Sequence, residues 1–243
     1  GKVLEGARVG TWAAMMKGQP PRSAVVCLGC EWFKGQGRPA LVALAKELRE
    51  RLAEAASALD CRLPVYVLFT KADEIPFFTD FVRPLNQGEA ADPLGVTLPL
   101  AEGQDPGQYT QWQGARLKGA FDGLFRALAR KRGDVMAREG DPTLRAAAYE
   151  FPREFAKLAD GASEFLLELT KPSQLRISPF LRGFYFTGVR PVAAGGRPEP
   201  IVAPPVPQAP RGATMVFDPS TLAAQAVPPP RSGARVAQWT FLQ

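Results

Sequence analysis

The chain has 243 residues, and 46% of them are apolar, which is enough for one large α/β domain or two smaller domains with a buried core. The net charge of +6 comes from 30 Lys and Arg residues against 24 Asp and Glu residues. This excess is too small and too dispersed to indicate a nucleic-acid partner. The absence of His excludes Ser-His-Asp triads, two-His zinc sites and His-dependent acid–base catalysis within this chain.

The chain contains three cysteines, Cys27, Cys30 and Cys61. An odd number argues against a secreted disulfide scaffold and indicates a reducing compartment, by default the cytoplasm. Cys27 and Cys30 form a C-x-x-C pair, but a zinc site needs two more ligands and a redox pair needs a helix N-terminus, so we interpret them as buried thiols. No apolar run approaches the roughly 18 residues of a membrane span. The chain is therefore expected to be a soluble piece of a larger protein.

The first third of the sequence predicts a strand, a helix and a second strand. A loose apolar pattern over 3–17 predicts a preceding helix, and the β-branched run over 23–30 predicts a strand buried on both faces. Leucines at steps of three and four residues predict an amphipathic helix over 38–59. The run VYVLF over 65–69 predicts the second strand. This spacing is that of a βαβ unit, whose two strands are parallel.

A further strand is predicted over 183–189, more than a hundred residues later, as the next strand of the same parallel sheet. The interval, about 83–172, must therefore hold an insertion. Its Pro- and Gly-rich part, 84–107, predicts a long surface loop. Helices are predicted over 109–131 and 152–169, the second with a Pro near its start.

The composition changes after Arg190. Prolines spread among Gly and Ala predict an extended linker over 191–235, and the apolar residues 236–243 are expected to begin a further element. The predicted organisation is therefore an α/β domain over 1–190, the linker, and this terminal piece.

The tetrapeptide Thr70-Lys71-Ala72-Asp73 directly follows the second predicted strand, where GTPase-type proteins carry the [N/T]-K-x-D motif that reads guanine. In that role the Asp73 carboxylate accepts two hydrogen bonds from the base, and the Lys71 stem packs along it. The alternative is an ordinary polar turn, because turns after strands often contain these residue types.

The sequence contains no G-x-x-x-x-G-K-[ST] motif. It therefore lacks the backbone cradle, the Lys and the Mg²⁺-binding hydroxyl that nucleoside triphosphate hydrolysis requires. Either that motif lies upstream in the intact protein, or the fold is a scaffold that has lost its chemistry. No catalytic residue and no metal ligand is assigned within the chain.

Three segments together resemble the IcmF/TssM family, the large inner-membrane component of type VI secretion systems and of related type IV systems. LPVYVLFTKADEIPFFTDFV, residues 63–82, carries the closest resemblance, and residues 149–172 and 181–188 resemble two later family segments in the same order and spacing. The terminal VAQWTFL, residues 236–242, resembles the start of a further helical region of the family. Phe77 departs from the pattern, because the family usually has Gly before Phe near this position.

The resemblance implies a fold and a set of site residues. The fold is a partial P-loop GTPase-like parallel sheet with a helical insertion, corresponding to the later part of the cytoplasmic NTPase-like domain of a membrane-anchored protein. The implied base-binding residues are Thr70, Lys71 and Asp73, with Thr187 and Gly188 in the last loop on the base side.

The resemblance implies a scaffold that docks baseplate, sheath-associated and membrane-complex proteins at the cytoplasmic face of the bacterial inner membrane. A second hypothesis is part of an active GTPase or ATPase that powers assembly, with GTP or ATP and Mg²⁺ bound by the intact protein. A third is a soluble α/β binding module unrelated to secretion.

Overall fold

The computed structural model of the chain describes residues 23–35, 37–100, 106–173, 176–193 and 235–240. The predicted helix over 3–17 and most of the predicted linker over 191–235 lie outside these residues. None of the helices in the described ranges has both the length and the hydropathy needed to cross a bilayer.

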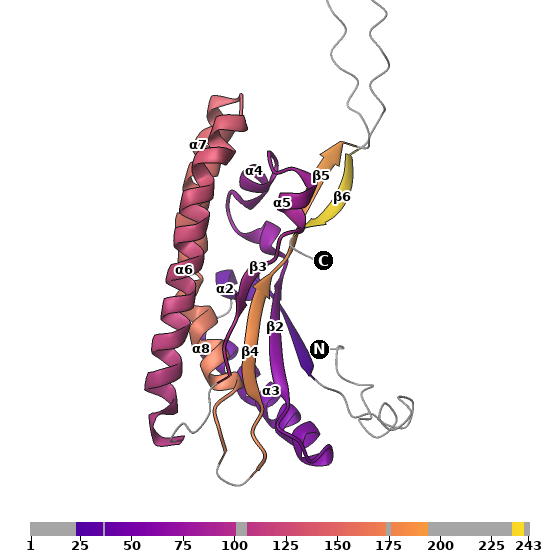
Figure 1. The fold of residues 1–243 in the computed structure, drawn as a ribbon, viewed down its shortest axis with the longest axis vertical. Helices are drawn as coiled ribbons and strands as arrows, with labels where there is room; N and C mark the ends of the chain where they lie inside the picture. The colour runs from indigo at the N-terminus through magenta and orange to yellow at the C-terminus, as the bar shows by residue number, and fades with distance from the viewer. Residues whose placement is uncertain (1–22, 36, 101–105, 174–175, 194–234, 241–243) are drawn as a thin grey trace, which may run out of the picture. The chain divides into compact units, whose positions relative to one another are not determined.

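The central sheet has four strands in the order β1-β2-β4-β3 (Figure 1). Strands β1 (Ala24–Gly29), β2 (Pro64–Thr70) and β4 (Phe180–Phe186) are parallel neighbours, which confirms the predicted βαβ unit and the third strand. β3 (Leu94–Thr97) pairs antiparallel with β4. The expectation of a purely parallel sheet is therefore wrong, and the fold is α/β with a mixed sheet.

Strand β1 is not buried on both faces, as its apolar run had predicted. Val26 and Leu28 are buried, but Val25 is 62% exposed and Cys27 is also exposed. The difference arises because β1 lies at the edge of this sheet and contributes alternate residues to the core. The interpretation of Cys27 as a buried thiol is therefore wrong. Cys30 is buried, and burial together with the neighbouring Glu31 carboxylate raises the pKa of its thiol to about 12.

The predicted amphipathic helix forms as α3 (Arg38–Ala58), which has Pro39 in its first turn and is preceded by the short helix α2 (Trp32–Gly35). Leu41 and Ala45 enter the core. α3 packs against α8 (Ala159–Leu169), and an ion pair between Arg49 and Glu168 joins the two helices.

The predicted surface loop over 84–107 contains α5 (Gln87–Ala91) and strand β3, so this expectation is wrong over those residues. α5 follows the 3₁₀ turn η1 (Ala72–Glu74) and α4 (Phe78–Val82). A capping box between Asn86 and Glu89 begins the helix, because the two side chains satisfy each other's backbone donors. A Cβ on Gly95 would lie 2.3 Å from the carbonyl oxygen of Phe184, so only Gly allows β3 to approach β4 this closely.

The insertion continues through the 3₁₀ turn η2 (Pro106–Gln108) into α6 (Tyr109–Arg138), which is seven residues longer than predicted. The helix predicted over 152–169 is two helices, α7 (Pro142–Ala156) and α8. Pro152 lies inside α7, and the chain turns at Lys157 and Leu158. There the backbone N–H groups bond carbonyls three residues back, which tightens the last turn and ends the helix.

After β4, strands β5 (Gly188–Ala193) and β6 (Arg235–Thr240) form a separate two-stranded sheet. The resemblance had implied the start of a helical region at 236–242, and residues 235–240 form a strand instead. The chain divides into two compact units. Of the described residues, Arg190, Trp239 and Thr240 belong with the α/β unit, and 191–193 and 235–238 belong to the other.

Candidate nucleotide-base site

The Thr70-Lys71-Ala72-Asp73 loop follows the carboxyl end of β2, the middle of three parallel strands. The loops after β1 and β4 meet it there, because the carboxyl ends of parallel strands lie at one edge of the sheet. The N–H of Cys30 donates to the carbonyl of Thr70 at 2.8 Å, and that of Thr187 donates to the carbonyl of Phe69 at 2.9 Å. The structure therefore brings all five implied base-site residues together at this edge.

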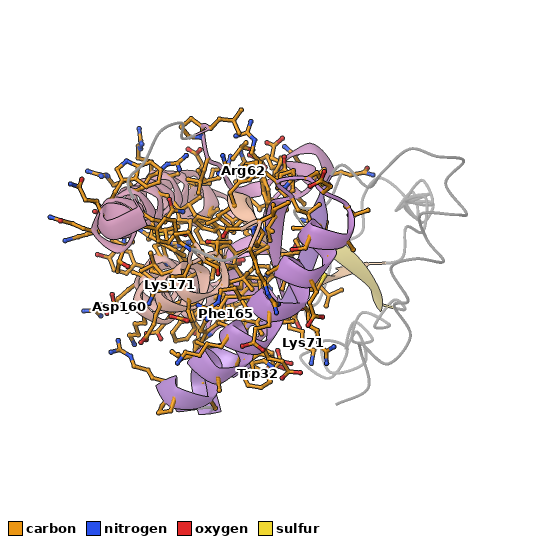
Figure 2. The ribbon with its side chains drawn as sticks, turned by 90° about the horizontal axis from the view of Figure 1, so that it is seen from below. Trp32, Arg62, Lys71, Asp160, Phe165 and Lys171 are labelled. Atoms are coloured by element: carbon orange, nitrogen blue, oxygen red, sulfur yellow. The ribbon has the colours of Figure 1, made fainter. Side chains whose placement is uncertain are left out.

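Lys71 points toward the loop after β1. Its backbone has φ 54°, and its ammonium lies 2.6 Å from Oε1 of Glu31. Figure 2 labels Lys71 and also Trp32, the residue that follows Glu31. This hydrogen bond raises the pKa of Lys71. Burial has the largest single effect on Glu31 and would raise its pKa, but the hydrogen bond from Lys71, a backbone hydrogen bond and the positive charge of Lys71 together lower it.

Glu31 is a member of the site that sequence reasoning missed. Its position as the first charged residue after β1 was the available signal, because the ends of adjacent parallel strands lie side by side. Oε2 of Glu31 is buried without a hydrogen-bond partner among the described residues. Glu31 thus binds the ammonium group of Lys71, the residue whose stem would pack along the base in a guanine site.

Asp73 joins the loop after β2 to the loop after β4. Its Oδ1 accepts a hydrogen bond from the N–H of Val189 at 3.0 Å, and the N–H of Ala72 donates to the carbonyl of Thr187 at 3.0 Å. The Asp73 carboxylate is the group expected to bind guanine, and one of its two oxygens already accepts a hydrogen bond from the backbone. The arrangement connects two strand ends that are far apart in the sequence.

The hydroxyl of Thr187 faces the protein interior. Thr187 is fully buried, and its Oγ1 donates to the carbonyl of Thr240 at 2.6 Å, while Oγ1 of Thr240 donates to the carbonyl of Gly188 at 3.0 Å. The Thr187 side chain therefore holds the end of β6. A contact between this hydroxyl and a base would require these bonds to break.

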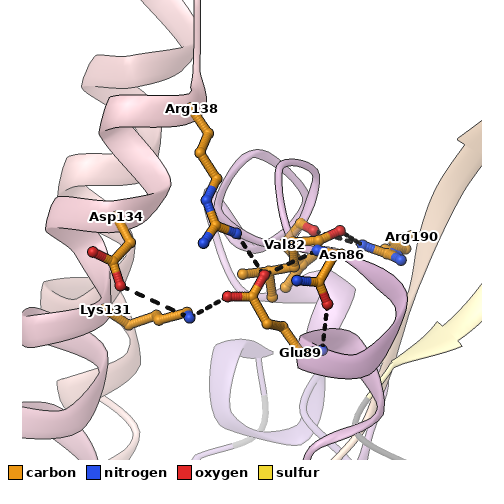
Figure 3. A network of polar contacts seen from close by, with 8 residues as sticks. Val82, Asn86, Glu89, Lys131, Asp134, Arg138 and Arg190 are labelled. Atoms are coloured by element: carbon orange, nitrogen blue, oxygen red, sulfur yellow. Dashed lines mark hydrogen bonds and ion pairs between the residues drawn. The ribbon is translucent and has the colours of Figure 1, made fainter.

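The segment after Gly188 is also fixed to the helical insertion (Figure 3). Arg190 is buried, and its guanidinium donates to the carbonyl of Val82 at 3.1 Å and to that of Leu85 at 2.6 Å. Burial lowers the pKa of Arg190. These bonds attach the beginning of β5 to the connection between α4 and α5.

Glu89 connects α5 to α6 in the same region (Figure 3). Its carboxylate accepts hydrogen bonds from Arg138 at 2.6 Å, from Lys131, and from the N–H of Asn86 at 3.0 Å. Arg138 has the largest effect and Lys131 the next, and together they lower the pKa of Glu89 to about 2.

Glu89→Gln is expected to flatten the dependence of stability on pH between about 4.5 and 2. A carboxylate whose pKa is depressed by folding stabilises the protein above its unfolded pKa, and this contribution is lost as the pH falls toward the folded value. Chemical denaturation at a series of pH values measures the slope. Glu47→Gln on α3, an exposed carboxylate with no ion pair in the described part, is the matched control. An equal change of slope in both variants would contradict the role of Glu89.

The residue types at this edge are those expected of a site for a nucleotide base, and not of a site for its phosphates. Lys71 and Asp73 are the residue types that a guanine site uses, whereas the sequence has no phosphate-binding loop. Within the described ranges, no group of three or more His, Cys, Asp or Glu side chains is placed to hold a metal ion.

Comparison with known proteins agrees with the sequence segments noted above. A family described as the IcmF-related N-terminal domain matches residues 17–230. Over 143 residues, 59% of the chain, the sequence is 35% identical to the type VI secretion system component TssM1 of Pseudomonas aeruginosa, and the match covers 13% of that protein. The chain thus spans a small part of the length of this relative. No solved structure matches the chain. The chain belongs to the IcmF/TssM family.

Proposed function

We propose that the chain is a scaffold domain of P-loop GTPase-like ancestry in a type VI secretion membrane complex. In this role it docks baseplate and sheath-associated proteins at the cytoplasmic face of the bacterial inner membrane. The match to TssM1 supports the assignment to secretion. The third hypothesis, a module unrelated to secretion, requires the matched segments to agree by coincidence. The match to TssM1 argues against such a coincidence.

The observation that carries the scaffold role is the bonding of the loops at the base-site edge. Lys71 pairs with Glu31, Asp73 accepts from Val189, and Thr187 donates to Thr240. The Lys71–Glu31 pair is exposed and contributes little, whereas Thr187 and Thr240 are fully buried, and buried polar groups that satisfy each other hold one conformation. The edge therefore acts as a rigid junction between the ends of neighbouring strands, which is what a docking platform requires.

The test is a titration of the purified chain with purified baseplate components, singly and in combination, in which biolayer interferometry measures the association. Saturable association with at least one component is expected. An unrelated α/β protein of similar net charge is the control for electrostatic adhesion. If no component or combination associates, the docking role is wrong.

An NTPase is the second candidate, favoured by the placement of Lys71 and Asp73 at the carboxyl edge of parallel strands, where nucleotides bind in open α/β sheets. This reading requires a G-x-x-x-x-G-K-[ST] motif upstream in the parent protein. GTP or ATP with Mg²⁺ would then be held by that motif, and this chain would supply only the contacts to the base.

Asp73→Ala in a longer protein that includes the upstream motif is expected to weaken GTP binding by about tenfold or more, because the substitution removes the acceptor of two guanine hydrogen bonds. Isothermal titration with GTP and with ATP gives the affinities. Asp80→Ala, on α4 outside the loop, is the matched control. Unchanged GTP affinity on Asp73→Ala would refute the role assigned to this carboxylate.

A further inference from the structure

A second polar site lies away from the candidate base site. A hollow of about 740 Å³ is lined by α3, the residues that follow α8 and the residues that precede β4. The last of these groups comes directly before the amino end of β4, whereas the candidate base site follows the carboxyl ends of the strands. The hollow is therefore a separate place in the fold.

Four cations and three carboxylates, Glu50, Glu54 and Glu168, line the hollow. Positive charge is in excess once the ion pairs are considered, because Glu54 lies 4.0 Å from Arg51, outside the lining. Arg49 is paired with Glu168. Lys46, Lys171 and Arg176 also line the hollow, and no carboxylate among the described residues forms an ion pair with any of the three. Lys46 lies on α3, whereas Lys171 and Arg176 lie in the connection between α8 and β4. All three side chains are exposed, and Figure 2 labels Lys171.

The lining is held in place rather than assembled by chance side-chain positions. The Arg49 guanidinium bonds both the Glu168 carboxylate and the Glu168 backbone carbonyl, the latter at 3.2 Å, which fixes α3 against the end of α8. The hydroxyl of Ser178 accepts from the N–H of Ser173 at 2.8 Å and donates to the carbonyl of Arg176 at 3.3 Å. These bonds hold the backbone on both sides of the hollow.

We infer that this hollow is the docking site for an acidic segment of a partner protein, and this inference rests on the proposed scaffold function. The volume greatly exceeds what a single anion needs, and the lining is charged rather than mostly apolar, unlike a small-molecule pocket. Complementary charge of this kind guides and orients a protein partner. A flat anionic bilayer does not reach into a hollow of this kind, whereas an extended segment of a protein does.

The test uses a fluorescently labelled hexa-glutamate peptide as the probe, with hexa-glutamine as the neutral control, and measures anisotropy with the whole 243-residue chain. The triple variant Lys46→Glu, Lys171→Glu, Arg176→Glu is expected to weaken hexa-glutamate binding by about tenfold or more. The matched control is Lys118→Glu, Arg126→Glu, Arg130→Glu on the exposed side of α6, which changes the net charge equally. All six side chains are exposed, and circular dichroism confirms that both variants fold.

The same variants are then titrated with the purified baseplate components. A loss of binding in the hollow variant, with retention in the α6 variant, supports the inference. If a component binds both variants as well as the original chain, the inference is wrong and the scaffold function stands. If the original chain binds no component, the scaffold function and the docking inference both fail, and hexa-glutamate binding then reports only an anion site. Equal weakening by both variants, or stronger binding of inorganic phosphate than of hexa-glutamate, also overturns the inference.

Discussion

Phe69→Ala is expected to lower the free energy of unfolding by about 3–5 kcal/mol. Phe69 is the last apolar residue of β2 and has no exposed surface. Its ring stacks on Phe186 with centroids 4.9 Å apart and meets Phe33 edge-on at 5.6 Å. Truncation would remove these contacts and leave a cavity at the centre of the sheet, next to the loop that carries Lys71.

The control for this variant is Phe125→Ala on α6, because the Phe125 side chain is 39% exposed. It is expected to change the free energy of unfolding by less than about 1 kcal/mol. Urea denaturation followed by circular dichroism measures both variants. Phe69→Leu, which retains most of the volume, is expected to lie between them and serves if Phe69→Ala does not fold. A cost for Phe69→Ala no larger than that for Phe125→Ala would contradict the proposed centre of the core.

Gly188→Ala is expected to destabilise the fold by about 1–3 kcal/mol, through crowding at the candidate base site. A Cβ at this position would lie 2.8 Å from the backbone nitrogen of Asp73 and 3.0 Å from a ring carbon of Phe78. Neither neighbour is the free end of a flexible side chain. The two loops must therefore separate, and the hydrogen bond from Val189 to Asp73 lengthens or breaks.

Gly119→Ala is the matched control, because a Cβ at this helical position of α6 meets no atom within 4 Å. There the same substitution is expected to stabilise the chain by up to about 1 kcal/mol, since Ala favours a helix over Gly. Thermal denaturation measures whether each substitution raises or lowers the stability of the chain. Amide hydrogen exchange adds a local readout, because the Val189 N–H should exchange faster in Gly188→Ala alone. Stabilisation by both substitutions would show that the loops are not in close contact.

Helix α3 and strands β1, β2 and β4 could be predicted because each is encoded locally. The leucine spacing of α3 matches the helical repeat, and the short apolar runs have the length of strands. The position of Thr70 to Asp73 followed directly, because a polar loop at the end of a strand needs no long-range information to be located. The family segments, which keep their order and spacing, were also readable from the sequence.

Strand β3 and the exposure of β1 could not be predicted in this way. β3 has four residues, too few to show a period, and it forms because Gly95 lets it pair with β4, which lies far along the chain. Whether β1 is buried on one face or both depends on its place in the sheet order, and an apolar run of six residues does not encode that place.

The sequence by itself determined the family, the βαβ unit and the residues at the end of β2. Only the tertiary structure decided what those residues touch. The bonds from Lys71 to Glu31, from Val189 to Asp73 and from Thr187 to Thr240 join residues 40, 116 and 53 positions apart. A local pattern carries no record of such pairs, because each depends on strands that folding places side by side.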